Sequence, residues 1–300
     1  MKVLVTGATG NVGAQVVRVL GERGVATRAF VRDPGKATSM FGGDVELAVG
    51  DFADPESLRR ALHGVDRLFL ACGNVAGQVE YECAAIDAAK AAGVSGVVKL
   101  SSPDPAVDSP LIFDRWHGEI ERHLVSSGLP WVLLRPRTHM TNLLAYAETI
   151  RQTGTLFAPA GAARITFVDP VDVGAAAAAA LVDAGHEGSS YTLTGPEAIG
   201  FERIARELSE LAPAGDRVEY VDIPDDAARA ALLDAGLPDF VADFVVGVFQ
   251  SQRTGSMSET TDAVRTLTGR EPRAIGQFLR AHATAFGVEA ADPRATIGAR

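Results

Sequence analysis

The sequence predicts an α/β protein with a doubly wound parallel sheet, and three observations support this. Short apolar runs alternate with longer amphipathic stretches through the first 135 residues. The apolar runs are continuous, as in Val3-Leu4-Val5 and Leu68-Phe69-Leu70, which is typical of strands covered on both faces. The stretches between them are long enough for crossover helices, which make neighbouring strands parallel. A ligand of such a sheet binds at the carboxyl ends of its strands.

The periodicity places eleven elements in this first part. We expect strands at 2–6, 27–31, 45–49, 67–71, 97–101 and 131–135. Between them we expect helices at 12–23, 34–40, 55–62, 79–92 and 114–127.

The alternation is less regular after Pro136. We expect strands at 164–168, 190–194 and 218–223, and helices at 170–183, 201–211, 227–252, 259–267 and 274–286. We therefore predict three parts: a core over 1–136, a smaller mixed α/β lobe over 137–287 that completes the fold, and a loose tail over 288–300.

Composition excludes several classes of protein. The 300 residues carry a formal charge of -10, with 38 acidic and 28 basic side chains, and have no basic run of five, which argues against nucleic-acid binding. No stretch approaches the ~18 apolar residues of a membrane span, and the amino terminus does not resemble a signal peptide. Cys72 and Cys83 are expected as free thiols in a reducing compartment. A cytoplasmic location is the expectation.

A glycine-rich turn follows the first expected strand and opens the first helix. It reads Thr6-Gly7-Ala8-Thr9-Gly10-Asn11-Val12-Gly13. Glycine permits the tight turn, lets main-chain amides approach a pyrophosphate and allows close packing of helix on strand. The helix amino terminus adds unpaired N–H groups and partial positive charge. We predict a dinucleotide held by Gly7, Thr9, Gly10, Asn11 and Val12; the alternative is a purely structural turn.

The end of the second strand bears on the choice of cofactor. Arg32 stands there, with Lys36 four residues later. A cation at this place suits a ribose 2′-phosphate, whereas an acidic residue suits a free 2′-hydroxyl. This favours NADPH over NADH. Asp33 as a hydroxyl acceptor, with Arg32 as a solvated loop charge, is the alternative.

At this point the residues resemble a known family. The glycine turn is followed by Val31-Arg32-Asp33-Pro34, Gly50-Asp51-Phe52 and Leu133-Leu134-Arg135-Pro136, and later by 167–173 (FVDPVDV) and 191–196 (YTLTGP). Together these resemble the NmrA-like branch of atypical short-chain dehydrogenases/reductases, over about residues 1 to 286. The family includes NADPH-dependent quinone and azo-dye reductases, and redox-sensing regulators that bind a dinucleotide without turning it over.

The resemblance implies further cofactor contacts on a Rossmann fold. It implies that Asp51 and Phe52 lie near the adenine, Ala71 and Cys72 near its ribose, and Ser101 near the nicotinamide. From the residues alone, Asp51 is equally well explained as a helix cap before Pro55. Cys72 in an apolar run is more often a small core residue than a nucleophile, and we do not expect it to be reactive.

The catalytic pair of the wider superfamily is missing. Classical members carry Tyr-x-x-x-Lys, and an alignment on this helix puts Phe113 and His117 at the two positions. Phenylalanine has no proton to give. We name His117 and Ser101 as catalytic candidates, with His117 acting as a general acid or holding the nicotinamide ribose.

Two alternatives remain open for this region. His117 is also explained as a helix-surface residue paired with Glu121 at i, i+4. For Lys99 we expect a strand-end charge outside the pocket; the alternative is that it faces the site.

The sixth strand ends at Pro136, which we predict as a cofactor contact. Substrate contacts are expected close to this strand end. Phe113, Trp116, His139 and Asn142 are the candidates there, because aromatic groups suit a flat molecule. No histidine spacing predicts a metal site.

Two functions of different classes follow. The first is an NADPH-dependent oxidoreductase that reduces a small quinone-like or related flat carbonyl substrate, because hydride transfer to an electron-poor ring needs little acid assistance. The alternative is a non-catalytic dinucleotide sensor, which would also need a protein partner. An isomerase or dehydratase has no specific support, and the oligomeric state is left open, with a homodimer as one option.

Overall fold

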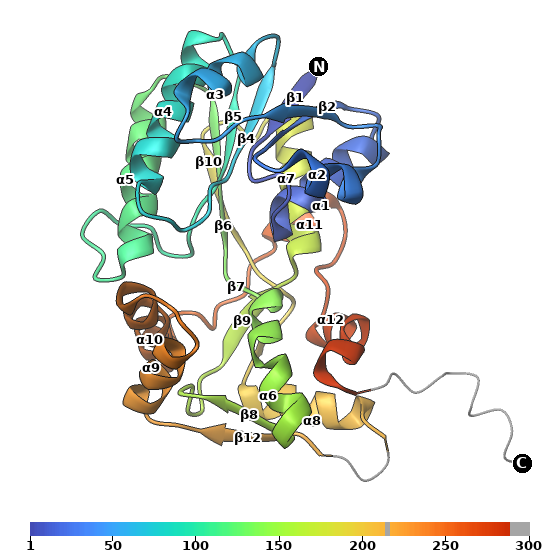
Figure 1. Ribbon diagram of the computed structural model, residues 1–300, viewed down its shortest axis with the longest axis vertical. Helices are drawn as coiled ribbons and strands as arrows, with labels where there is room; N and C mark the ends of the chain where they lie inside the picture. The colour runs from blue at the N-terminus through green and yellow to red at the C-terminus, as the bar shows by residue number, and fades with distance from the viewer. Residues whose placement is uncertain (214–216, 289–300) are drawn as a thin grey trace, which may run out of the picture. The chain divides into compact units, whose positions relative to one another are not determined.

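A seven-stranded sheet with the order β10-β6-β5-β4-β1-β2-β3 is the framework of the first of two structural units (Figure 1). The computed structural model describes residues 1–213 and 217–288. Every neighbouring pair in this sheet is parallel. Its strands are β1 (Lys2–Val5), β2 (Ala26–Val31), β3 (Glu46–Val49), β4 (Arg67–Leu70), β5 (Val97–Leu100), β6 (Trp131–Pro136) and β10 (Ser189–Leu193).

Helices cover both faces of this sheet. On one face α3, α4 and α5 bury an apolar cluster against alternate residues of β1, β4, β5 and β6, and α1, α7 and α11 pack together on the other (Figure 1). The helices of the unit are α1 (Asn11–Glu22), α2 (Pro34–Phe41), α3 (Pro55–Leu62), α4 (Gln78–Ala91), α5 (Ile112–Ser126), α7 (Pro170–Val182) and α11 (Ala263–Thr268). The predicted doubly wound fold is confirmed.

Helix α7 packs closely on its neighbours because its middle part, residues 174–180, consists only of glycine and alanine. Residues 172–181 of this helix are all buried. It packs directly on α1, where a Cβ atom added at Gly174 would lie 2.3 Å from the Cβ of Gln15. No larger side chain fits between these two helices at that point.

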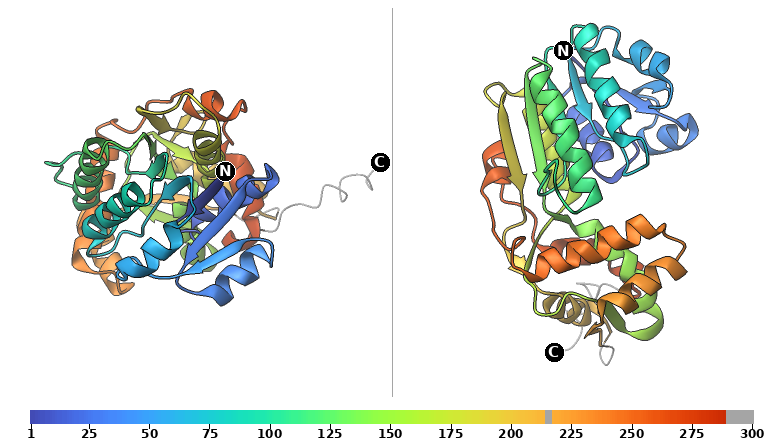
Figure 2. Two further views of the ribbon diagram at one scale, coloured as in Figure 1. Left: turned by 90° about the horizontal axis from the view of Figure 1, so that it is seen from above. Right: turned by 90° about the vertical axis from the view of Figure 1, so that its left-hand side faces the viewer.

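The first unit differs from the predicted core by two additional segments. It comprises Met1–Arg137, Pro170–Leu193 and Asp262–Glu271. Strand β10, expected within the lobe, instead pairs with β6 in parallel, with Tyr191 opposite Leu134 (Figure 2, right). This pairing satisfies the N–H and C=O groups on the outer side of β6 and makes β10 the edge strand. Local periodicity finds such a strand but not its partner.

The second unit comprises Thr138–Asp169, Thr194–Thr261 and the described part of Pro272–Arg300. It holds a three-stranded sheet, β11-β9-β7, and a parallel pair, β12-β8. Phe167, Phe201, Phe249 and Phe278 lie in its apolar core. Its elements are β7 (Thr138–His139), the 3-10 helix η1 (Met140–Tyr146), α6 (Ala147–Thr153), β8 (Thr155–Ala158), β9 (Ile165–Val168), β11 (Ala198–Ile199), α8 (Phe201–Leu211), β12 (Glu219–Asp222), α9 (Asp225–Asp234), α10 (Asp239–Arg253), α12 (Ile275–Ala281) and the 3-10 helix η2 (Ala283–Phe286).

Two further expectations concern the end of the chain and membranes. Val288, the first residue of the predicted tail, is buried in the core of the second unit, and 289–300 lie outside the described residues. Within 1–213 and 217–288, no helix has both the length and the apolar character to cross a bilayer.

Candidate functional site

The glycine turn between β1 and α1 has a geometry that only glycine satisfies. Gly7 has φ +59, and a Cβ atom there would lie 2.9 Å from the carbonyl oxygen of Ala71 at the end of β4. A Cβ atom on Gly13 would lie 2.1 Å from the carbonyl oxygen of Gly7. The Thr6 hydroxyl fixes the strand end by accepting a 2.9 Å hydrogen bond from the Ala71 amide. The turn is therefore held tightly, with no side chain inside it.

In the same turn, the N-cap position of α1 is a glycine and so has no side-chain cap. Gly10 is the N-cap and is exposed, as is Asn11, whereas Thr9 is half-buried and Val12 is buried. Main-chain N–H groups and the positive end of the helix dipole are therefore available to an anion. This cradle fits the pyrophosphate of a dinucleotide.

Asp33, which follows the end of β2, caps the amino terminus of helix α2. Its Oδ1 accepts a 3.0 Å hydrogen bond from the Lys36 amide, so it is the N-cap of α2. Arg32 and the side chain of Lys36 are exposed, and no hydrogen bond or ion pair of either side chain is found among the described residues. The structure thus gives Asp33 a structural task, which weakens its alternative role as a hydroxyl acceptor.

Asp51 is not the cap of α3. That position belongs to Asp54, whose Oδ1 accepts from the Glu56 amide at 3.1 Å, so the alternative that made Asp51 the helix cap is wrong. The Asp51 carboxylate instead accepts from the Ala53 amide at 2.9 Å, in a turn that begins just after β3. Phe52 packs edge-on against Phe30, with ring centroids 5.8 Å apart.

Ala71 and Cys72 follow β4. Ala71 is buried and Cys72 partly so. Burial is the main cause that raises the pKa of the Cys72 thiol to about 11, helped by the charge of Glu82. The thiol stays protonated at neutral pH, as expected for an unreactive cysteine.

A buried polar network lies between β5, α4 and α5. Lys99 Nζ is 2.6 Å from Glu82 Oε2, and both side chains are fully buried. The same ammonium donates to the Leu100 carbonyl oxygen at 2.6 Å and lies 3.2 Å from His117 Nδ1. Gln78 Nε2 donates to Glu82 Oε1 at 3.0 Å and lies 3.4 Å from His117 Nε2. Lys99 is therefore a buried, paired charge and not a solvated one, whereas its position relative to the substrate pocket stays a prediction.

The surface alternative for His117 is wrong as well. Glu121 pairs with Arg135, whose Nε donates to it at 3.0 Å, and His117 faces the interior. Burial, aided by the charge of Lys99, lowers the pKa of His117 well below 6.5. The ring is therefore neutral at pH 7 and has no imidazolium proton to give.

Lys99, Glu82 and Gln78 carried a signal that the sequence analysis did not use. Lys99 interrupts the apolar run Val97-Val98-Lys99-Leu100, and a lysine within a strand covered on both faces needs a buried partner. Gln78 and Glu82 fall in phase with the buried face of α4, which continues at Ala85 and Ile86. Polar residues at core positions of neighbouring elements indicate such a network.

The other candidates of the first unit lie on β5, α5 and β6. Ser101 follows β5 and is buried, and its Oγ has no hydrogen-bond partner among the described residues. Phe113 is buried and packs on half-buried Trp116, with centroids 5.2 Å apart. Pro136 is buried at the end of β6, opposite Leu193.

His139 and Asn142 belong to the second unit. His139 ends β7, which pairs with β9, and burial lowers its pKa to about 4, so the ring is neutral at pH 7. Asn142 is exposed on η1. Within the described ranges, no group of three or more metal-ligating side chains is found.

Comparisons with known proteins give consistent matches. The model of the NmrA-like family matches residues 1–266. An NAD(P)H azoreductase of Xenophilus azovorans is 38% identical over 95% of this chain and 99% of its own. A (4-alkanoyl-5-oxo-2,5-dihydrofuran-3-yl)methyl phosphate reductase of Streptomyces griseus is 40% identical over 96% of this chain and 100% of its own.

A solved structure agrees with these relatives. The NADPH-dependent quinone oxidoreductase of Escherichia coli, in complex with NADPH, superposes with a TM-score of 0.84 at 31% identity, covering 94% of this chain and 99% of its own. With a glycine cradle on a doubly wound sheet and these matches along nearly its whole length, the chain belongs to the NmrA-like family.

Proposed function

We propose that this chain is an NAD(P)H-dependent reductase that prefers NADPH and reduces small quinone-like or related flat carbonyl compounds by hydride transfer. The observation that carries the proposal is the cradle at Gly7, Gly10 and Gly13, where the N-cap Gly10 has no side-chain cap and a Cβ atom at Gly7 or Gly13 would collide with main chain. Such a cradle serves a diphosphate rather than a packed core.

Each cofactor contact in the proposal has its own chemistry. A bound nicotinamide cofactor supplies the hydride. Arg32 and Lys36 hold a ribose 2′-phosphate, Asp51 and Phe52 border the adenine, and Ala71 and Cys72 line its ribose. Ser101 and Pro136, at the carboxyl ends of neighbouring strands, face the nicotinamide.

The substrate class is supported by what the relatives share. Their names give an azo compound, a quinone and a dihydrofuran with acyl and oxo groups, all of which are conjugated acceptors of a hydride. Phe113 stands where the wider superfamily has its tyrosine, so the acceptor does not take a proton from that position. The rings of Phe113 and Trp116, together with His139 and Asn142, are the proposed substrate contacts.

His117 is proposed as a support for the nicotinamide end rather than as a cationic acid. Its neutral ring, held between Lys99 and Gln78, orders the start of α5 beside Phe113. An imidazolium at this place would add a second buried positive charge next to Lys99.

The test of function is the oxidation of NADPH in the presence of quinones and azo dyes. We expect loss of nicotinamide absorbance with at least one acceptor class. No turnover on any acceptor, together with cofactor binding in calorimetry, would favour a sensor, the alternative supported by the missing hydroxyl at Phe113.

Cofactor choice is tested separately through Arg32→Ala. Charge-assisted hydrogen bonds contribute about 1.5–3 kcal/mol, so NADPH affinity should fall roughly 10- to 100-fold while NADH affinity changes little. Arg59→Ala is the control, because this exposed arginine on α3 pairs only with Glu56 among the described residues. Equal losses for both cofactors would remove the phosphate role from Arg32.

A further inference from the structure

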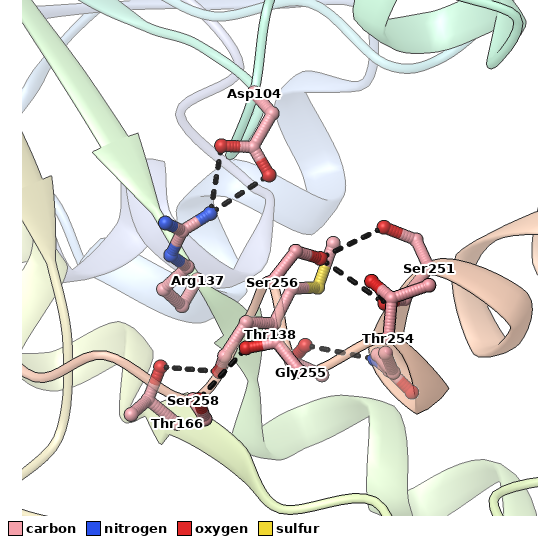
Figure 3. A network of polar contacts seen from close by, with 11 residues as sticks. Asp104, Arg137, Thr138, Thr166, Ser251, Thr254, Gly255, Ser256 and Ser258 are labelled. Atoms are coloured by element: carbon pink, nitrogen blue, oxygen red, sulfur yellow. Dashed lines mark hydrogen bonds and ion pairs between the residues drawn. The ribbon is translucent and has the colours of Figure 1, made fainter.

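A second charged cluster lies in the first unit where β5 and β6 end. Arg137 directly follows β6, and its main-chain amide donates to the Leu193 carbonyl oxygen at 2.9 Å. Its Nη1 donates to both carboxylate oxygens of Asp104, at 2.9 and 2.8 Å (Figure 3). The Arg137 side chain is 10% exposed, whereas that of Asp104 is 51% exposed.

The guanidinium of Arg137 has donors left over. Its recorded bonds all use Nη1, and Nε is buried with no partner among the described residues. A buried N–H donor without a partner lowers the stability of the fold unless a hydrogen-bond acceptor, such as a ligand atom, binds to it. The carboxyl edge of an open α/β sheet is also where ligands bind. This arginine is therefore placed to receive a negatively charged or carbonyl oxygen.

Asp114, a buried acid near the start of α5, belongs to the same cluster. It immediately follows Phe113, which occupies the place of the missing tyrosine. Its main-chain carbonyl oxygen accepts a 3.2 Å hydrogen bond from the amide of Ala106, two residues after Asp104. The pKa of its carboxyl responds to Ser102 and to the charges of Asp104 and Arg137.

The loop that carries Asp104 is fixed on α5. The Ala106 amide donates to the Asp114 carbonyl oxygen at 3.2 Å, and Arg115 Nη1 donates to the Ser109 carbonyl oxygen at 2.7 Å. A Cβ atom added at Gly118 would lie 2.5 Å from the carbonyl carbon of Ala106, so loop and helix are in direct contact. The cluster is thus a built feature and not a chance approach of surface charges.

We propose that Asp114 and Arg137 replace the absent tyrosine–lysine pair, with Asp114 as the proton donor and Arg137 as the group that holds the substrate oxygen. This inference rests on the proposed reductase function. The electron pair of the hydride forms a new C–H bond on the acceptor. The π pair of the C=O bond moves onto the acceptor oxygen, whose negative charge the Arg137 guanidinium stabilises. The Asp114 O–H bond breaks and a new O–H bond forms on that oxygen. A proton from water then restores the acid, so that one hydride and one proton are consumed.

The ionisation of Asp114 is compatible with this role. Burial is the largest cause that raises its pKa to about 6; the negative charge of Asp104 adds to the rise, whereas Ser102 and Arg137 oppose it. An acid must carry its proton to donate it, so turnover should fall as the pH rises through about 6.

The first experiment measures the acid without any cofactor. The carboxyl carbon of Asp114 is titrated by NMR in the wild type, in Asp104→Asn and in Asp108→Asn. Removing Asp104 takes away a charge that raises the pKa of Asp114 and frees Arg137 to lower it, so the midpoint should move to lower pH. Asp108 is exposed on the same loop and is the matched control, with an unchanged midpoint expected. An unshifted midpoint in Asp104→Asn overturns the cluster.

The second experiment measures turnover. Asp114→Asn should lower kcat roughly 10²-fold and abolish the fall above pH 6. Arg137→Gln should lower kcat by a similar factor, with partial recovery in Arg137→Lys, because a cation is restored without the planar geometry. Cofactor affinity, followed by fluorescence, should change little in Asp114→Asn.

The outcomes separate this inference from the proposed function. If the wild type reduces acceptors but Asp114→Asn and Arg137→Gln keep both kcat and its pH profile, the inference fails and the reductase stands. If the wild type reduces nothing while the NMR midpoint still responds to Asp104→Asn, the cluster exists but the proposed function fails.

Discussion

The two halves of the sheet's carboxyl edge are built by different means. Where β1 and β2 end, the main chain forms the site: glycines keep it free of side chains, and the N-cap of α1 has no side-chain cap. Where β5 and β6 end, charged side chains form it, through the Lys99–Glu82, Arg135–Glu121 and Arg137–Asp104 pairs. The first half should therefore be sensitive to substitutions that add a carbon atom at a glycine. The second half should be sensitive to substitutions that remove a charge.

This difference reflects the chemistry that each half would serve. A diphosphate carries a fixed charge, and rigid main-chain dipoles can hold it. A reacting oxygen gains charge during the reaction, and titratable groups can respond to that change. The predictions below follow from this division.

The largest expected effect is in the charged half. Lys99→Met leaves the buried Glu82 carboxylate without its partner, so the free energy of unfolding should fall by about 3–5 kcal/mol. Urea unfolding followed by circular dichroism measures it. The double variant Lys99→Met, Glu82→Leu should recover most of the loss, because no uncompensated charge remains. A double variant as unstable as the single one would show that the network is worth more than its ion pair.

An intermediate effect is expected in the main-chain half. Gly13→Ala forces the turn apart, because the new Cβ atom would lie 2.1 Å from the Gly7 carbonyl oxygen. We expect the cofactor dissociation constant, measured by calorimetry, to rise roughly 10²-fold, about 2.7 kcal/mol. Gly21→Ala in the same helix has nothing within 4 Å of the added atom and should keep full affinity while gaining about 0.5–1 kcal/mol of stability. Equal binding by both variants would contradict the cradle.

The smallest effect distinguishes a helix cap from a cofactor contact. Asp33→Ala removes the N-cap of α2 and should cost about 1 kcal/mol of stability. The ratio of NADPH to NADH affinity should stay as in the wild type. A marked shift of that ratio towards NADPH would instead return Asp33 to the ribose.

The main features of the first unit could be predicted from the sequence because its elements are defined locally. Short apolar runs separated by helix-length stretches predicted β1 to β6, and the spacing of Gly7, Gly10 and Gly13 predicted the turn. The partner of β10 could not be predicted in this way, because strand pairing depends on which edge is open in three dimensions. The short strands β7 and β11 have only two residues each and leave no periodicity to detect.

The candidate site was predictable only in its main-chain half. The positions of the glycines in the sequence indicate directly where the main chain needs a positive φ or a close approach. The pairing of Arg137 with Asp104 joins residues 33 apart in the chain, and neither residue stands out locally. Lys99 was visible within an apolar run, but its interpretation needed Glu82 on another element.

The insertion of α7 and β10 into the first unit has a consequence for biosynthesis. During translation the first six strands emerge before α7, which helps to cover one face, and before β10, which pairs with β6. The nascent sheet must wait until residue 193 has been added, with an apolar face and an open strand exposed in the meantime. We expect a chain truncated after Arg137 to aggregate when expressed alone, even though it contains the whole glycine turn.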